Sequence, residues 1–188
     1  MAAAPPLSEA LLKDKTGAEV KASTLWKDKA ALVVVLRRPG CLLCREEAMH
    51  IWGQRAEYDA LGIQLACVLH EWKEREVEAF SPEYWGGPLY LDESKAFYAT
   101  VHGGAVRRGS IIDLLNPFSQ AWKNVKRAKA CGAGKDSNLV GDGLTMGGLV
   151  VLKKGGEIMY TYGEKTFGDH APESEVMEAC KKAAAGNQ

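Results

Sequence analysis

The sequence lacks the features that assign a protein to nucleic acids or to membranes. Its 24 lysine and arginine residues balance 24 aspartate and glutamate residues, so the formal net charge is zero. No apolar run approaches the roughly 18 residues that can cross a bilayer. The N-terminal residues have neither the basic start of a signal peptide nor the arginine and serine content of a transit peptide. We therefore expect no nucleic acid partner, no integral membrane segment and a cytosolic location.

Cysteine and histidine are also scarce. Five cysteines, an odd number without regular spacing, favour a reducing compartment over a disulfide framework. Cys67 is predicted to be an inert core thiol, Cys131 a surface residue and Cys180 part of the packing; they offer no second pair for a zinc site. The four histidines, without metal-ligand spacing, are His50, His70, His102 and His170. We expect no bound metal, and His70, just past a predicted strand, is the histidine placed nearest the site described next.

The chain does contain a C-x-x-C pair between a strand and a helix. The unbroken apolar run 30–36 predicts a strand buried on both faces, as in a parallel sheet. Pro39 and Gly40 end this strand with a turn, and a helical pattern follows over residues 42–61. Cys41 and Cys44 therefore lie at the carboxyl end of a strand, where ligands and chemistry collect in open α/β sheets.

The spacing of the two cysteines indicates what they can do. Residues three apart on a helix lie one above the other, close enough to form a disulfide. Cys41 falls at the helix start, where unpaired N–H groups and the helix dipole stabilise a thiolate. Arg37, Arg38 and Arg45 add positive charge, so we expect the pKa of Cys41 to lie below the usual value of about 8.5. Cys41 is the predicted nucleophile and Cys44 the resolving thiol.

The remaining pattern predicts one α/β domain over residues 1–188. The predicted strands are residues 19–21, 30–36, 63–69, 89–91, 149–152 and 158–162, after an amphipathic piece at 8–14. The predicted helices are residues 42–61, 71–80, 92–98, 117–130 and 173–185. A βαβ unit comes first and an antiparallel hairpin with a helix last. This is the layout of a thioredoxin-like fold, a mixed central sheet flanked by helices, with a helical insertion at about 101–146.

Several motifs, in one order over most of the chain, resemble a known family. Residues 36–48, which contain the C-x-x-C pair, are similar to the active-site stretch of the peroxiredoxin-like 2 proteins, relatives of selenoprotein U. Three further motifs resemble the prostamide/prostaglandin F synthase branch of that family most closely. They are Leu-Tyr-Leu-Asp-Glu-Ser-Lys at 89–95, the glycine-flanked strand at 147–156, and Phe-Gly-Asp at 167–169.

The resemblance implies reduction of a prostaglandin-type endoperoxide to the F-type product. The family's active-site cysteines correspond to Cys41 and Cys44. No tightly bound cofactor is implied, because thioredoxin, reduced by NADPH through thioredoxin reductase, would regenerate the dithiol. We expect the Cys41 thiolate to attack the O–O bond, Cys44 to complete a disulfide, and Arg38 to bind the oxyanion or the substrate carboxylate. Two alternatives stay open: a general thioredoxin-dependent lipid or hydrogen peroxide reductase, and a redox-sensing adaptor without turnover.

Two departures from related families affect these expectations. In ordinary peroxiredoxins a proline and a threonine precede the attacking cysteine; if Cys44 took that place, Arg37 and Cys41 would hold the proline and threonine positions. In ordinary thioredoxins a cis-proline faces the cysteines, whereas here residues 145–148, Thr-Met-Gly-Gly, occupy that region. We expect a differently built wall, with the glycines leaving room for a substrate.

The predicted helix 117–130 allows two interpretations. Phe118, Trp122 and Val125 could line an apolar groove for an acyl chain. The basic residues that could meet its carboxylate are Lys123, Lys126, Arg127 and Lys129. A plain amphipathic helix, with its apolar face inward and its basic face in solvent, explains the same pattern.

Overall fold

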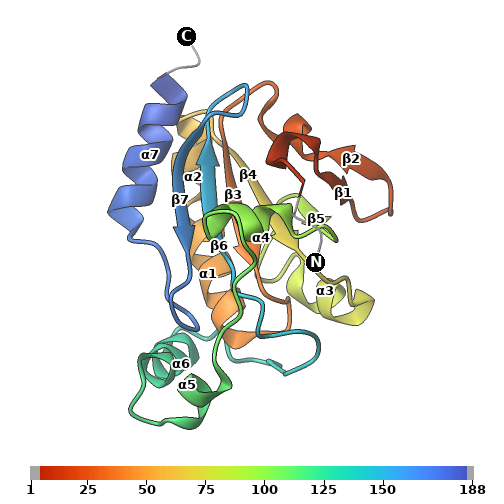
Figure 1. The fold of residues 1–188 in the computed structure, drawn as a ribbon. Helices are drawn as coiled ribbons and strands as arrows, with labels where there is room; N and C mark the ends of the chain where they lie inside the picture. The colour runs from red at the N-terminus through yellow and green to blue at the C-terminus, as the bar shows by residue number, and fades with distance from the viewer. Residues whose placement is uncertain (1–4, 186–188) are drawn as a thin grey trace.

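The computed structural model describes residues 5–185, and in this part of the chain seven strands form one mixed sheet (Figure 1). The strand order across the sheet is β2-β1-β5-β4-β3-β6-β7. In chain order the strands are β1 Leu11–Lys13, β2 Glu19–Lys21, β3 Ala31–Leu36, β4 Gln64–Leu69, β5 Leu89–Leu91, β6 Gly148–Leu152 and β7 Ile158–Gly163. β3, β4 and β5 are parallel, whereas β6 and β7 add an antiparallel edge. The predicted mixed sheet is confirmed.

β3 lies inside the sheet because both of its faces are apolar. Leu32, Val34 and Leu36 join one hydrophobic core, and Val33 and Val35 join the other. All six residues of the strand are buried. Alternate side chains of a strand point to opposite faces, so an uninterrupted apolar run must be covered on both sides.

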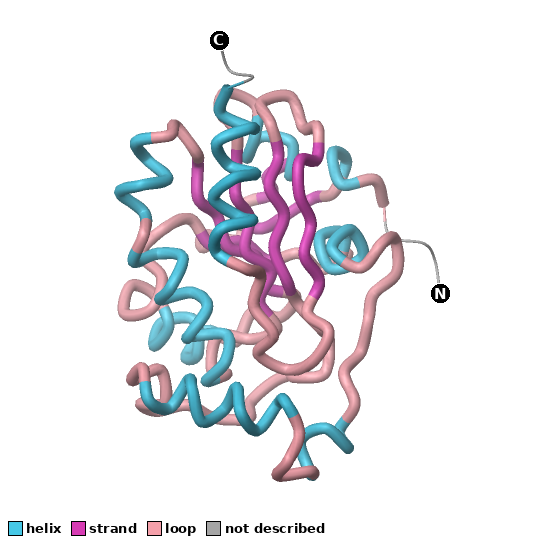
Figure 2. Tube along the Cα trace, turned by 90° about the vertical axis from the view of Figure 1, so that its left-hand side faces the viewer, coloured by secondary structure: helices cyan, strands magenta, loops and turns pink. Residues whose placement is uncertain are grey.

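Helices cover both faces of the sheet (Figures 1 and 2). The α-helices are α1 Leu42–Gly53, α2 Arg55–Ala60, α3 Glu74–Phe80, α4 Ala96–Val101, α5 Ile111–Leu115, α6 Gln120–Ala130 and α7 Glu173–Ala185, and the 3-10 helices are η1 Leu7–Glu9 and η2 Ala22–Trp26. The larger core packs under α1, α2, α3, α6 and α7, and the smaller core under η2 and α4. Among the helices of the described residues, none combines the length and apolar character that a bilayer crossing requires.

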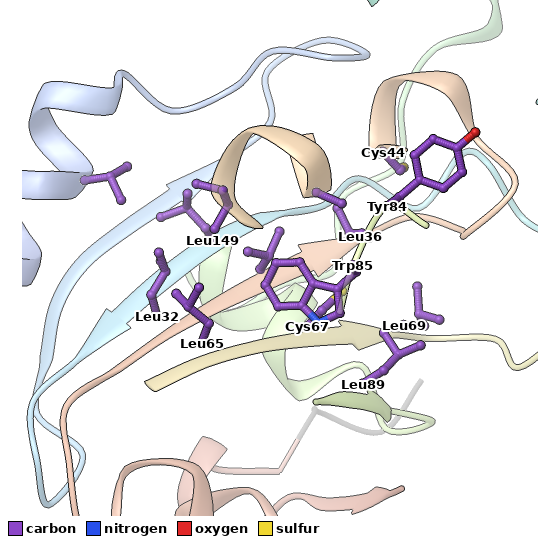
Figure 3. Close-up of a cluster of buried hydrophobic side chains, with 14 of the residues drawn as sticks. Leu32, Leu36, Cys44, Leu65, Cys67, Leu69, Tyr84, Trp85, Leu89 and Leu149 are labelled. Carbon is purple, nitrogen blue, oxygen red and sulfur yellow. The ribbon is translucent and has the colours of Figure 1, made fainter. Parts of the chain in front are cut away.

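The larger core brings β3 and β4 against the helix that carries the cysteines. Figure 3 shows Leu36 of β3 and Cys67 of β4 close to Trp85, with Cys44 and Tyr84 nearer the end of the strand. Trp85 is completely buried, and its indole N–H donates to the carbonyl of Pro88 at 3.0 Å. Trp85 also packs against Trp52 of α1, with 5.2 Å between the ring centres, so buried apolar side chains lie between α1 and the sheet.

Some predicted boundaries are wrong for local reasons. The predicted helix 42–61 is two helices, because Gly53, a poor helix former, precedes Gln54 with φ −93° and ψ 9°. Gly62, at φ 71°, ends the second helix in the left-handed conformation that glycine allows. The helix predicted from 71 starts at Glu74. The amphipathic piece at 8–14 contains η1 and the short strand β1, which pairs with β2.

The segment between α4 and β6 carries α5 and α6 and lies at the end of the sheet where α1 begins (Figures 1 and 2). The sequence did not predict α5. Its N-cap Ser110 accepts the N–H of Ile112, which is the usual way a serine starts a helix. α6 begins at Gln120 rather than at 117, because Ser119 caps it by accepting the N–H of Trp122.

Candidate active site

The two cysteines of the C-x-x-C pair lie at the start of α1, as predicted. Cys41 is the N-cap, with extended backbone angles, and its carbonyl accepts the N–H of Arg45 at 3.0 Å. Cys44 follows in the first turn of the helix. The side chains are 7% and 3% exposed, and all five cysteines of the chain are free thiols. The site is therefore a nearly buried dithiol at a helix N-terminus, where unpaired N–H groups favour a negative charge.

The surroundings make the two thiols chemically different. A hydrogen bond from the Cys44 side chain, followed by the guanidinium groups of Arg37 and Arg38, holds the pKa of Cys41 well below its usual value, although burial acts in the opposite direction. Burial, and then the neighbouring Cys41, raise the pKa of Cys44 well above its usual value. Since only the thiolate is a nucleophile, these opposite pKa shifts favour Cys41 over Cys44 as the attacking group, as the sequence predicts.

Arg37 is the central cation of the site and is only 3% exposed. Its Nε lies 3.3 Å from Oε2 of Glu164, and its guanidinium stands 5.1 Å from the ring centre of Phe167. Burial raises the pKa of Glu164, whereas Arg37 lowers it. Burial and then Glu164 raise the pKa of Glu47 well above the usual value. The positive charge of Arg37 therefore acts both on the cysteines and on two buried carboxyl groups, those of Glu47 and Glu164.

A cavity of about 250 Å³ opens beside Cys41. Its apolar wall comes from Leu42 and Leu43 on α1, Val125 on α6, Leu139 and Phe167, and its polar wall includes Arg37, Arg38 and Asn138. The combination of apolar lining and two cations next to a nucleophile fits an amphipathic anion. A larger cavity of about 460 Å³ lies near Asp28, Trp52 and Gly62, away from both cysteines.

Arg38 also lines this cavity, and its predicted contact with a substrate stays a prediction. Its Nη1 donates to the carbonyl of Val140 at 3.3 Å, while its Nε is buried without a hydrogen-bond partner among the described residues. Gly143 lies so close that a Cβ added to it would be 3.0 Å from the guanidinium. Because a buried donor without a partner is costly, this N–H is available to an incoming acceptor.

Arg45 and the close packing at Gly40 hold the loop that carries Cys41. Arg45 is 1% exposed; its Nε donates to the carbonyl of Pro39 at 2.9 Å and its Nη1 to that of Lys135 at 2.6 Å. A Cβ at Gly40 would lie 2.5 Å from Oδ1 of Asn138, so a larger residue there would have to displace the Asn138 side chain. Arg45, predicted to add positive charge near Cys41, also holds this loop against its neighbours.

The other predicted residues lie in less reactive places. Cys67 is completely buried in β4, and burial raises its pKa, which fits the predicted inert thiol. Cys131 is exposed at the end of α6, and Cys180 lies on the buried face of α7. His70 packs edge-on against Tyr98 at 5.1 Å and does not line the cavity.

The remaining histidines stand apart from the thiols. His50 is exposed, with its Nε2 3.4 Å from Glu173, and His102 approaches the carbonyl of Met146 at 3.3 Å. His170 packs near the buried Glu46 and Glu47 of α1.

Close packing of the backbone explains the two glycines in residues 145–148. A Cβ at Gly147 would lie 2.1 Å from the carbonyl oxygen of Val35, and one at Gly148 would lie 1.9 Å from that of Tyr162. The expectation that these glycines leave room for a substrate is wrong, because neighbouring strands fill the space. The N–H of Gly147 instead donates to Glu164 at 2.8 Å, which helps to fix the carboxylate beside Arg37.

Both interpretations of the helix 117–130 fit only in part. Val125 lines the cavity, but Phe118 precedes the helix and is 89% exposed. The buried face of α6 is formed by Ala121, Asn124 and Ala128. Arg127, predicted as a partner for the substrate carboxylate, binds both carboxylate oxygens of Glu46 at 2.7 and 2.8 Å.

The sequence did not single out Glu164, Glu47 or Phe167 as functional residues. Glu164 follows β7 directly, at the sheet end that also carries the cysteines, and this position next to a strand end is the signal that could have found it. Phe167 belongs to one of the motifs that carried the resemblance. Nothing in the spacing of Glu47 separates it from the solvated glutamates of other helices.

The fold is that of a thioredoxin-like protein, and it places a C-x-x-C dithiol at the start of α1. The bacterioferritin comigratory protein of Xanthomonas campestris, a structure described for its alkyl peroxide reduction activity, superposes with a TM-score of 0.60 at 11% identity, covering 95% of this chain and 94% of that one. At this identity the likeness concerns the fold, and it confirms the predicted thioredoxin-like class.

Sequence comparisons give the family. Residues 50–166 match the family model described as AhpC/TSA antioxidant enzyme. Peroxiredoxin-like 2A of Xenopus tropicalis is 38% identical over 163 residues, 86% of this chain and 68% of the relative, and that of Mus musculus is 38% identical over 86% and 71%. The chain therefore belongs to the peroxiredoxin-like 2 family, and its class of activity is thiol-dependent reduction of peroxides. The family model begins beyond Cys44, so the match does not include the cysteines, and their roles stay predictions.

Proposed function

We propose that this protein reduces an amphipathic lipid peroxide with the Cys41–Cys44 dithiol, and that a prostaglandin-type endoperoxide is the preferred member of that class. The observation that carries the proposal is the placement of Cys41. Its thiol is stabilised as a thiolate by Cys44, Arg37 and Arg38, and it borders an apolar cavity.

The reaction balances with the groups present and one external reductant. The Cys41 thiolate attacks one oxygen of the O–O bond, forming an S–O bond and releasing the other oxygen as an alkoxide, which takes a proton. Cys44 then gives up its proton and attacks the Cys41 sulfur as a thiolate; the S–O bond breaks, the second oxygen takes that proton and leaves as an alcohol, and a disulfide forms. With a hydroperoxide the intermediate is a sulfenic acid and water leaves in the second step. Thioredoxin, reduced with NADPH, returns the disulfide to the dithiol.

The cavity favours a lipid over hydrogen peroxide as substrate. Leu42, Val125 and Leu139 give an acyl chain an apolar wall, and the unpartnered Nε of Arg38 offers a charged hydrogen bond to a carboxylate. Hydrogen peroxide would use neither. This reasoning supports an amphipathic substrate and an Arg38 contact, and it leaves the general hydroperoxide reductase as the second candidate.

The test is NADPH consumption in the presence of thioredoxin and thioredoxin reductase. A prostaglandin endoperoxide, a fatty acid hydroperoxide and hydrogen peroxide are compared, with Cys41→Ser as the inactive control. Selective turnover of the endoperoxide supports the proposal in full. Equal or faster turnover of the hydroperoxides makes the protein a general reductase. No turnover of any of the three overturns the enzymatic role and leaves the redox-sensing adaptor.

A further inference from the structure

Four large apolar side chains lie exposed together around α5. Ile111, Ile112, Leu115 and Phe118 are 54%, 74%, 75% and 89% exposed. Monomeric proteins bury such side chains or use them in contacts, and a cluster of them marks an interaction site. Figures 1 and 2 place α5 and α6 at the end of the sheet where α1 begins, which is also the cavity end. We call these four residues, with the lysines described next, the α5–α6 surface.

The same segment is strongly basic although the whole chain is neutral. Residues 105–135 contain seven basic residues and one acidic residue, Asp113. The basic residues are Arg107, Arg108, Lys123, Lys126, Arg127, Lys129 and Lys135. Arg108 pairs with Asp142 and Arg127 with Glu46, but within residues 5–185 the four lysines have no ion pair. Lys123, Lys126 and Lys129 are exposed on α6, next to the apolar cluster.

We propose that the α5–α6 surface docks onto a bilayer that contains anionic phospholipids. Bulky apolar side chains flanked by lysines are the combination that lets a helix lie in a membrane interface, with the apolar groups inserted and the lysines on the headgroups. A second copy of the chain is a poor occupant, because it would bring two basic faces together. A protein partner is less favoured, since protein interfaces are depleted in lysine.

Docking through this surface would bring the cavity beside Cys41 close to the membrane. Val125 of α6 and Leu139, which is 85% exposed, line the cavity beside Cys41. A docked molecule would therefore hold the cavity close to the lipid, where peroxidised acyl chains are found. This last step rests on the proposed function, but docking itself does not, so the two can fail separately.

The experiment is co-sedimentation of the full chain with lipid vesicles. One set contains phosphatidylcholine alone and the other includes phosphatidylserine, each at low and at high salt. We expect binding about tenfold stronger to the anionic vesicles, and a marked loss at high salt because screening weakens the lysine contacts. Cys41→Ser should bind equally well, which separates docking from catalysis.

Two sets of variants locate the contact. Ile112→Ser with Phe118→Ser, and separately Lys123→Glu with Lys126→Glu and Lys129→Glu, should each lower binding at least to the level seen with neutral vesicles. Matched controls are Leu11→Ser with Ile158→Ser, which are 50% and 45% exposed elsewhere, and the lysines Lys21, Lys27 and Lys181 changed to Glu. The controls should bind like the parent chain.

Three results would overturn the proposal. They are no preference for anionic vesicles, equal loss in the test and control variants, and a concentration-dependent dimer that the test variants abolish while vesicles bind nothing. The last result would assign the surface to a second copy of the chain.

Discussion

Nε of Arg37 lies 3.3 Å from Oε2 of Glu164, and both side chains are almost completely buried. The oxygens of Glu164 also accept the N–H groups of Gly147, just before β6, and of Gly168, in the loop after β7. Burial alone would lower the pKa of Arg37. Glu164, and then the two cysteines, more than offset this effect, so the pKa is raised overall. Glu164 thus positions the cation that stabilises the Cys41 thiolate.

Replacing Arg37 should weaken both the thiolate and the fold. In Arg37→Met we expect the pKa of Cys41 to rise by about one unit or more, because a neighbouring cation is lost. The buried Glu164 loses its partner, which costs about 3–5 kcal/mol in the free energy of unfolding. The pH dependence of iodoacetamide alkylation measures the first effect, and urea denaturation measures the second.

Arg37→Lys keeps the charge and separates the two effects. It should retain most of the thiolate stabilisation while losing part of the stability, because an ammonium lacks the planar fork of a guanidinium. Arg75→Met, on the exposed side of α3, is the control for a lost positive charge. An unchanged alkylation profile in Arg37→Met would show that the cation does not act on Cys41.

The Cys44 side chain should also control the pKa of Cys41. Cys44→Ala removes the hydrogen bond that most lowers this pKa, whereas Cys44→Ser keeps a hydroxyl donor in the same place. We therefore expect the alkylation midpoint of Cys41 to rise in Cys44→Ala and to stay closer to the parent in Cys44→Ser. Cys131→Ser is the background for both variants, since Cys131 is exposed and would react as well. Equal midpoints in the two variants would exclude the hydrogen bond as a cause.

How far the sequence predicted this site depends on the range of each interaction. The apolar run before Pro39 and Gly40 placed Cys41 at a helix start because strand burial and helix capping are local properties. Glu164 was missed because its contact with Arg37 joins segments far apart in the chain, and no residue near Arg37 signals such a partner. The catalytic roles of Cys41 and Cys44 and substrate binding by Arg38 stay predictions that the experiments above test.

In the fold, too, the features set by local sequence were predicted, and those set by tertiary packing were not. The hairpin of β6 and β7 and the last helix were predicted from periodicity and a Gly-Gly turn, which are local. The break at Gln54 was missed because a single glycine weakens a helix without ending it. Phe118 was predicted on the apolar face of a helix from 117, but α6 starts at Gln120 after its N-cap Ser119, which leaves Phe118 outside the helix. Periodicity indicates that a helix has two faces, and only tertiary packing decides which one is covered.

Arg38 should determine affinity for substrates that carry a carboxylate. Arg38→Met removes the buried Nε that has no partner within the described chain. A hydrogen bond to a charged group contributes about 1.5–3 kcal/mol, so we expect KM for a fatty acid hydroperoxide to rise about tenfold or more with a smaller change in kcat. The methyl ester of the same hydroperoxide should show little difference between Arg38→Met and the parent. An equal rise in KM for acid and ester would mean that Arg38 shapes the cavity without binding the carboxylate.

His170 should make the stability of the fold depend on pH. It lies 3.8–3.9 Å from carboxylate oxygens of Glu46 and Glu47, and Nη2 of Arg127 is 3.4 Å from its Nδ1. Burial outweighs the opposing effect of Glu46 and lowers the pKa of His170 from 6.5 to about 4. Between these two values the unfolded chain binds a proton that the folded chain does not, so the folded state loses stability as the pH falls below 6.5.

For one such group the loss between pH 7 and pH 5 is about 2 kcal/mol. Urea denaturation at the two pH values should show it in the parent chain and in His50→Gln, which changes an exposed histidine. In His170→Gln the difference between the two pH values should shrink by about that amount, because glutamine does not titrate. If His170→Gln kept the full pH dependence, the proton would bind elsewhere, and the contact between α1, α6 and the segment before α7 would not be pH-sensitive.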